Sequence, residues 1–260
     1  MNVPAFVRPA TAVGKDPFYF TRGGCDIREL LSAKVTGELL SCITSICAMN
    51  NAKSLRIDPL VIAIRAQLGH MRSSGEAPVS AIDLALGELD ATGELPAFPI
   101  QEPLPACRHL VEIDASPRVA GASTSQLLDS FMACWPAVTW RQNENYRHVP
   151  EMQAYLADSA YCELVGPHGG MIQNQQVSMG FLIIGPQVNY PSHKHPAHEI
   201  YSVVSGVGHW WRYGEPWTPR EPGATVYHGS GQAHGIRTVE QPLLAFYLWV
   251  GDIDPLPVAS

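Results

Sequence analysis

The sequence lacks the features that mark several large classes of protein. Its 260 residues include 17 Lys and Arg against 24 Asp and Glu, which gives a net charge of −7, and no basic run is present. Nucleic-acid binding requires clustered positive charge, so a nucleic-acid partner is not expected. The longest apolar runs, such as 60–64 and 179–185, are far shorter than the roughly 20 residues of a membrane-spanning helix. No membrane span is therefore expected.

Residues 1–15 include Arg8 and Lys15 but lack the continuous apolar segment of a secretory signal, which favours a cytoplasmic location. The six cysteines include no C-x-x-C pair and no zinc-finger spacing, so we expect most of them to be reduced core residues. A composition of 46% apolar and 16% charged residues is that of a folded globular protein.

The first 160 residues are dominated by helical patterns. Apolar residues recur every three or four positions in 26–50 and 59–71, and a further helix is predicted for 80–89. Four prolines in 93–105 favour an extended connector there, because proline restricts its neighbours and removes a backbone donor. Two more helices are predicted for 125–134 and 151–160.

The pattern changes from Cys162 onward to short runs rich in Val, Ile, Tyr and Trp, separated by turn residues. The predicted strands include 176–184, 199–204, 209–213, 225–228 and 243–250. Short strands at this spacing indicate an antiparallel barrel or jelly roll. We therefore predict an α+β protein in three parts. These are a helical region at 1–105, a helical connector at 106–164 that packs on the barrel, and the barrel itself with its site at 165–260.

Three histidines and a glutamate fall within the twelve residues 190–201. Residues two apart on a strand face the same side, so His193 and His195 share a face, and Glu199 has the same parity. His234 follows a Pro-Gly turn and is expected to join them from a neighbouring strand. Imidazole and carboxylate ligands suit one divalent ion, either Zn, Fe(II) or Mn(II), and they leave coordination positions for a substrate. His209 and His228 are left unassigned.

These residues resemble the first cupin motif, with His193, His195 and Glu199 followed by Gly206. The second cupin motif is matched more loosely, because Pro222 and Gly223 are adjacent and no Asn follows His234. A narrower resemblance, over residues 140–253, is to the cupin-type dimethylsulfoniopropionate lyases. It rests on the following residues: Gly185, Pro186, Tyr190, Pro191, Glu199, Tyr201, Trp210, Trp211, Pro222, Gly223, the segment 234–238 and the segment 248–252.

The resemblance implies β-elimination of dimethylsulfoniopropionate to dimethyl sulfide and acrylate. Such a reaction needs a base that removes the proton α to the carboxylate. A tyrosine can act as this base when a divalent cation and the sulfonium, both positively charged, lie close to it and favour its anionic form. Tyr201 is the preferred base and Tyr190 the second candidate. A sulfonium has no hydrogen-bond donor, so aromatic faces are its natural receptor, and Trp249, Trp211 and Trp210 are the candidates.

Two other classes of function remain open from the sequence. One is another metal-dependent cupin enzyme, a dioxygenase or an isomerase, acting on a small carboxylate. The other is a cupin that binds a small molecule without catalysis. In every case the predicted partner is a small molecule. The N-terminal helices are expected to form either a lid or a dimer contact, so a homodimer is one expected state.

Overall fold

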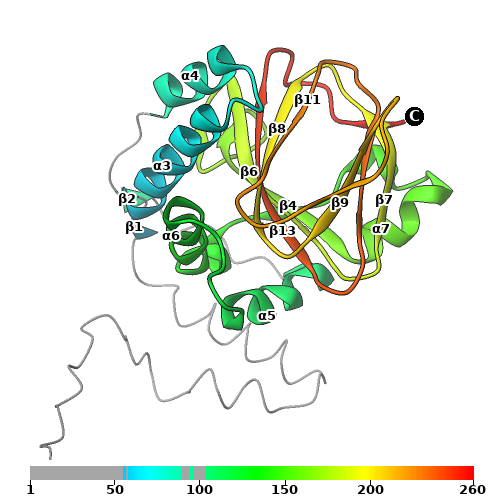
Figure 1. Cartoon of the computed structure of the whole chain (residues 1–260), viewed down its shortest axis with the longest axis horizontal. Coiled ribbons are helices and arrows are strands. Elements are labelled where there is room, and N and C mark those ends of the chain that lie inside the picture. Colours follow the sequence, from blue (N-terminus) through cyan, green and yellow to red (C-terminus); the bar gives the residue numbers. More distant parts are fainter. Residues whose placement is uncertain (1–54, 57, 90–93, 96–102) are drawn as a thin grey trace, which may run out of the picture. The chain divides into compact units, whose positions relative to one another are not determined.

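The structure is a computed structural model that describes residues 55–56, 58–89, 94–95 and 103–260 (Figure 1). These residues belong to one compact unit, Ile43–Ser260. The predicted helix at 26–50 lies outside the described residues, as does most of the predicted connector at 93–105.

The helices lie early in the described chain, as the apolar periodicity predicts. They are α3 (Asp58–Ser74), α4 (Val79–Glu88), α5 (His109–Ala115), α6 (Ala122–Met132) and α7 (Gln153–Ala157). The predictions for 59–71, 80–89 and 125–134 are confirmed by α3, α4 and α6. The prediction for 151–160 is too long, because α7 ends at Ala157 and a strand begins at Ser159. No described helix combines the length and apolar character needed to cross a membrane.

Most strands follow these helices and form two main sheets. The seven-stranded sheet has the order β11-β8-β13-β6-β4-β3, with β5 paired to β4, and the five-stranded sheet has the order β10-β9-β12-β7-β14. The strands of the first sheet are β3 (Trp140–Arg141), β4 (Ser159–Gly166), β5 (Ile172–Gln173), β6 (Val177–Ile184), β8 (His198–Ser205), β11 (Thr225–His228) and β13 (Leu243–Val250). Those of the second are β7 (Asn189–Lys194), β9 (Gly208–Arg212), β10 (Thr218–Arg220), β12 (His234–Thr238) and β14 (Val258–Ala259). A short separate pair joins β1 (Leu55–Arg56) to β2 (Glu94–Leu95).

The five predicted strands correspond to β6, β8, β9, β11 and β13. Among the described residues, all pairings are antiparallel except that of β4 with β5. The α+β class with a largely antiparallel sheet region is confirmed. The predicted barrel is not closed, because the two sheets among the described residues are not joined by strand pairing. The first sheet also begins before residue 165, since it includes β3 and β4.

Alternation along the strands of the larger sheet creates two apolar layers. One face packs against the helices, with Leu68 of α3, Phe131 of α6 and Phe246 of β13 in a single buried cluster (Figure 1). Phe131 stacks on Phe181 of β6 with the ring centroids 3.7 Å apart. This layer joins residues on both sides of position 105. The other face of the sheet contributes to a second buried cluster together with β7, β9 and β12. The interior between the sheets is where the predicted site residues lie.

A buried polar contact fixes the strand that carries Glu199 to the helices. The Gln67 side chain in α3 donates from Nε2 to Ser202 Oγ of β8 at 2.7 Å. Thr124 of α6 donates to Gln67 Oε1 at 3.1 Å. All three side chains are buried, so each hydrogen bond satisfies a group that water cannot reach.

Candidate metal centre and adjoining cavity

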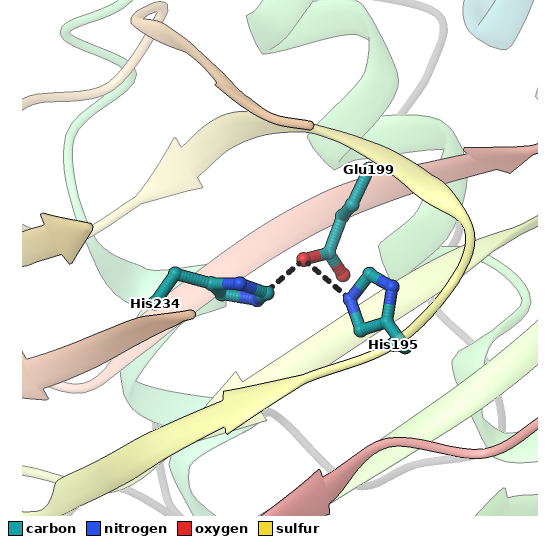
Figure 2. Close-up of side chains that lie close together, drawn as sticks. All are labelled: His195, Glu199 and His234. Carbon is teal, nitrogen blue, oxygen red and sulfur yellow. Dashed lines mark hydrogen bonds and ion pairs between the residues drawn. The ribbon is translucent and has the colours of Figure 1, made fainter. Parts of the chain in front are cut away.

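Three of the four predicted ligands converge between the two sheets. Glu199 projects from β8, His195 lies just after the end of β7, and His234 begins β12 (Figure 2). One ligand atom from each lies within 4.8 Å of the others, and all three residues are buried. The Glu199 carboxylate lies between the two imidazoles, with Oε2 3.3 Å from His195 Nε2 and 3.0 Å from His234 Nε2 (Figure 2).

Backbone carbonyl oxygens fix the orientation of these imidazoles. His195 Nδ1 lies 3.1 Å from the Ala197 oxygen, and His234 Nδ1 lies 2.8 Å from the Gln232 oxygen. With Nδ1 facing a carbonyl oxygen, an imidazole in its neutral form would carry its proton on Nδ1 and direct the Nε2 lone pair toward Glu199. Nε2 of His234 is buried and makes no hydrogen bond of suitable geometry. Two lone pairs facing a carboxylate suit a cation between them, so these residues fit a divalent metal ion.

His193 is buried beside this group without belonging to it. It pairs with His234 across β7 and β12, and the two ring centroids are 4.2 Å apart. Its Nδ1 lies 2.9 Å from the Pro191 oxygen, which again leaves Nε2 available. Burial lowers the pKa of His193 well below its ordinary value, and the neighbouring His234 lowers it further. His193 as a ligand stays a prediction.

His228 is a buried neighbour of Glu199 that the sequence left unassigned. It is the cross-strand partner of Glu199 in the β11–β8 pair, and its Nδ1 lies 3.3 Å from Glu199 Oε2. Its ring stacks on His234 with centroids 3.9 Å apart. The signal in the sequence was the predicted strand 225–228, which ends on this histidine. Only the pairing of that strand with 199–202 could have revealed the contact.

Opposing effects act on the pKa of Glu199. Burial by itself would raise the pKa of Glu199. A positive charge on His195, hydrogen bonds from His195 and His228, and the close approach of His234 outweigh burial and hold that pKa well below its ordinary value. The carboxylate is therefore ionised at neutral pH. For His228 itself, burial is the main cause that lowers the pKa to about 4.

A narrow cavity of about 60 Å³ adjoins the candidate metal centre. Glu199 and His193 line it, and so do both predicted catalytic tyrosines, Tyr190 and Tyr201. Tyr190 lies between two parallel rings, with centroid separations of 3.8 Å to both Tyr155 and His193. Its hydroxyl lies 3.0 Å from that of Tyr146. Burial raises the pKa values of Tyr190 and Tyr201 well above the ordinary value.

The three predicted tryptophans occupy different places. Trp249 lines the cavity, donates from Nε1 to Glu199 Oε1 at 2.6 Å and stacks on His195 with a centroid separation of 4.3 Å. Trp210 is buried beside Tyr201, with ring centroids 4.7 Å apart, but it does not line the cavity. Trp211, the next residue on β9, faces the other way and lies beside Trp217. Substrate binding by Trp210 and Trp211 stays a prediction that this placement does not favour.

Two facing sheets with a buried His-Glu-His group and an aromatic cavity define a cupin-like protein with a candidate metal centre. The family model described as dimethylsulfoniopropionate (DMSP) lyase matches residues 89–245, which is more than half of the chain. The chain therefore belongs to the DMSP lyase family.

Relatives and solved structures agree with this assignment. The chain is 29% identical to the dimethylsulfoniopropionate lyase DddQ of Ruegeria pomeroyi over 171 residues, which are 66% of this chain and 81% of the relative. It is 31% identical to the putative dimethylsulfoniopropionate lyase DddL of Cereibacter sphaeroides over 121 residues, or 46% of this chain and 48% of that one. The crystal structure of the Ruegeria pomeroyi DMSP lyase DddQ matches with a TM-score of 0.54 at 25% identity, covering 78% of this chain and 97% of that one. A structure from work on the DMSP lyases RdDddP and RnDddQII matches with a TM-score of 0.55 at 27% identity, covering 75% of this chain and 98% of that one.

Proposed function

We propose that this protein is a metal-dependent lyase that cleaves DMSP by β-elimination to dimethyl sulfide and acrylate. The observation that carries the proposal is the meeting, between the two sheets, of the group His195, Glu199 and His234 with a cavity lined by Tyr190 and Tyr201. Membership of the DMSP lyase family supports it independently.

The reaction requires three changes at the substrate. A base removes the proton from the carbon α to the carboxylate, and the electron pair of the broken carbon–hydrogen bond forms the new carbon–carbon double bond. The β-carbon–sulfur bond breaks, and its electron pair leaves with neutral dimethyl sulfide. No general acid is required, because the leaving group needs no proton.

Tyr201 is the residue we assign as the base, with Tyr190 as the second candidate. Tyr201 is two residues from Glu199 on β8 and lines the cavity with it, so its side chain faces the same interior. The hydroxyl of Tyr190 is already paired with that of Tyr146. Positive charge favours the phenolate form of a buried tyrosine, and the substrate brings a sulfonium with it.

His195, Glu199 and His234 would hold the metal ion, and His193 is proposed as a fourth ligand. A bound divalent ion would supply a Lewis acid for the carboxylate end of the substrate, where negative charge builds up as the proton leaves. The ligand set accepts Zn, Fe(II) or Mn(II). The predicted cytoplasmic location and homodimer remain proposals, and light scattering tests the second.

The proposal is tested by headspace gas chromatography of purified protein supplied with DMSP. We expect chelator-sensitive release of dimethyl sulfide with an equal amount of acrylate, at the same rate with and without oxygen. Reloading the chelated protein separately with Zn, Mn and Fe(II) identifies the active ion. No dimethyl sulfide with any of these ions would overturn the proposal. Turnover that requires oxygen would instead favour an oxygenase.

Removal of a ligand tests the metal centre in the same assay. His195→Ala is expected to lose both bound metal, measured by elemental analysis, and lyase activity. His148→Ala is the matched control, because His148 is exposed and lies outside the cavity. Stoichiometric metal in the His195→Ala protein would remove His195 from the ligand set.

A further inference from the structure

A second carboxylate, remote from the candidate metal centre in the sheet, lines the same cavity. It belongs to Glu163 of β4, which is only 6% exposed. The adjacent Cys162 and Leu164 pack in the layer against the helices. Because side chains alternate along a strand, Glu163 and Tyr161 face the interior between the sheets. Neither residue was singled out in the sequence, because 106–164 was assigned to a helical connector outside the barrel.

Strand pairing places Glu163 relative to Glu199. Ser178 of β6 donates from Oγ to Glu163 Oε2 at 2.9 Å. Ser178 is the register partner of Trp249, and Trp249 is the register partner of Glu199. Glu163 itself is the register partner of Gly180, so it is offset by two residues along the sheet from the row that joins Ser178, Trp249 and Glu199. With about 4.8 Å between neighbouring strands and about 3.3 Å per residue along them, the backbones that carry the two carboxylates are roughly 16 Å apart.

The Glu163 carboxylate is fixed by hydrogen-bond donors but forms no ion pair, although the Arg141 guanidinium reaches the same turn at Gly169. Oε1 accepts the backbone N–H groups of His168 at 2.8 Å and Gly170 at 3.0 Å. No ion pair in the described part of the chain includes Glu163. A buried carboxylate without an ion pair is costly, so a cationic group in the cavity would be stabilised there.

Aromatic rings complete this end of the cavity. Tyr161 and Tyr247 line it together with Glu163. Burial is the main cause that raises the pKa of each phenol; Arg141 lowers the pKa of Tyr161, and the Glu163 charge raises the pKa of both. Aromatic faces attract a cation that has no hydrogen-bond donor. A carboxylate surrounded by such rings is a receptor for an alkylated onium group.

We propose that Glu163, with Tyr161 and Tyr247, forms the subsite for the cationic end of the substrate. This inference rests on the proposed function and assigns the sulfonium of DMSP to a carboxylate and two tyrosines, rather than to the tryptophans alone. The sulfonium loses its charge as dimethyl sulfide departs. The Glu163 charge therefore stabilises bound substrate more than the transition state, and it acts on KM rather than on kcat.

Glu163→Gln removes the charge and keeps the local hydrogen bonds. The amide oxygen can accept the two backbone N–H groups, and the amide nitrogen can donate to Ser178. We expect KM for DMSP to rise about tenfold or more, with kcat not reduced. Inhibition by trimethylammoniopropionate, an unreactive cationic analogue, should weaken by a similar factor, while inhibition by propionate should not change. Glu151→Gln, at an exposed position, is the control for a change in net charge.

Three results separate this inference from its alternatives. Unchanged KM, or equal weakening of both inhibitors, would overturn the subsite and leave Glu163 as an anchor for the 166–170 turn. A wild-type protein that releases no dimethyl sulfide would contradict the proposed function, but calorimetry with the two inhibitors would still test the subsite.

A comparison of ligands on the wild-type protein avoids any effect of mutation on folding. Trimethylammoniopropionate and 4,4-dimethylpentanoate have the same shape and differ in the positive charge. We expect the cationic ligand to bind about tenfold more tightly or better. Equal affinity, or preference for the neutral ligand, would overturn the inference.

Discussion

At the scale of single residues, the roles of the cavity tyrosines can be separated from their packing. Tyr201→Phe removes one hydroxyl from a ring that also packs against Trp210. We expect metal content and melting temperature to be retained, while kcat falls by roughly 10²-fold to 10⁴-fold, the usual range for loss of a general base. Steady-state kinetics with elemental analysis checks this. Tyr213→Phe, on a residue that is 77% exposed, is the control. Near-normal kcat would transfer the base role to Tyr190.

Substitution of Trp249 tests whether a residue that contacts a proposed ligand changes the affinity for the metal. Trp249→Phe keeps a ring that can stack on His195 and removes the Nε1 donor to Glu199 Oε1. Loss of such a partner typically weakens metal binding by about 10-fold to 100-fold. We expect that change in a competition titration with a chelator. The matched variant Trp217→Phe, near Trp211 and outside the cavity, should bind metal like the wild type. Unaltered affinity in both would show that the hydrogen bond does not tune the ligand.

The cluster of histidines in the sequence predicted a metal site around Glu199, but parity did not predict which of these histidines lie beside the carboxylate. His193 and His195 were expected to face the same side because they are two residues apart. The strand β7 ends at Lys194, and His195 lies beyond it, where alternation no longer applies. Thus His195 joins Glu199 and His234, while His193 stacks on Tyr190 and meets His234 edge to face. Alternation along β9 directs Trp210 inward and Trp211 outward. The two residues had been predicted to share one role, the binding of the sulfonium.

At the scale of elements, the periodicity of apolar residues predicted where individual helices and strands lie, but it did not predict which strands pair. The strands around 177–184 and 243–250 are continuous apolar runs, and they form β6 and β13, which are buried along their whole length. The first two residues of β4 were assigned to the helix predicted for 151–160, and 106–164 to a helical connector, although β4 is paired with β6 over most of its length. That pairing gives Glu163 its place. Whether the sheets close into a barrel depends on contacts between distant strands, which no local pattern encodes.

The turn after β8 gives a physical reason for the glycine in the first cupin motif. Gly206 has a φ of +78°, and a Cβ atom built there would lie 1.9 Å from the Pro242 carbonyl oxygen. Gly206→Ala is therefore expected to lower the free energy of unfolding by about 2–4 kcal/mol, since it combines a left-handed backbone with a clash. Urea denaturation measures the change.

Gly214→Ala, in the turn after β9, is the matched control for Gly206→Ala. Gly214 has a φ of +86°, and a Cβ atom there would have no neighbour within 4 Å. It should show only the backbone cost, about 1 kcal/mol. If both variants lose the same stability, the close approach to Pro242 does not matter, and the backbone conformation alone explains the glycine.

At the scale of the whole molecule, the metal and the fold are expected to be linked. The proposed ligands come from β8, from β12 and from the residue just after β7, so they connect strands of both sheets. The strands β7 and β12 are paired in one sheet, whereas β8 belongs to the other sheet and faces them across the interior. A ligand that binds the folded state alone stabilises it by RT ln(1 + [L]/Kd), which is about 4 kcal/mol at a free concentration of 1,000 Kd. We expect chelation to lower the melting temperature of the wild-type protein, with little effect on His195→Ala. An equal drop in both would place the stabilising ion elsewhere.

The stability of the chelated protein should also depend on pH in a defined direction. His228 has its pKa lowered to about 4 in the fold, chiefly by burial, whereas an imidazole in the unfolded chain titrates near its ordinary pKa of about 6.5. Between these values the unfolded chain binds a proton that the folded protein does not. The contribution of His228 is therefore fully present above pH ~6.5 and is lost as the pH falls toward 4. Urea denaturation at pH 7.5 and 5 should show this loss, and His228→Gln should have a shallower pH dependence over that range. Parallel pH profiles for the two proteins would assign the acid sensitivity to other buried groups, among which His193 has its pKa lowered in the same direction.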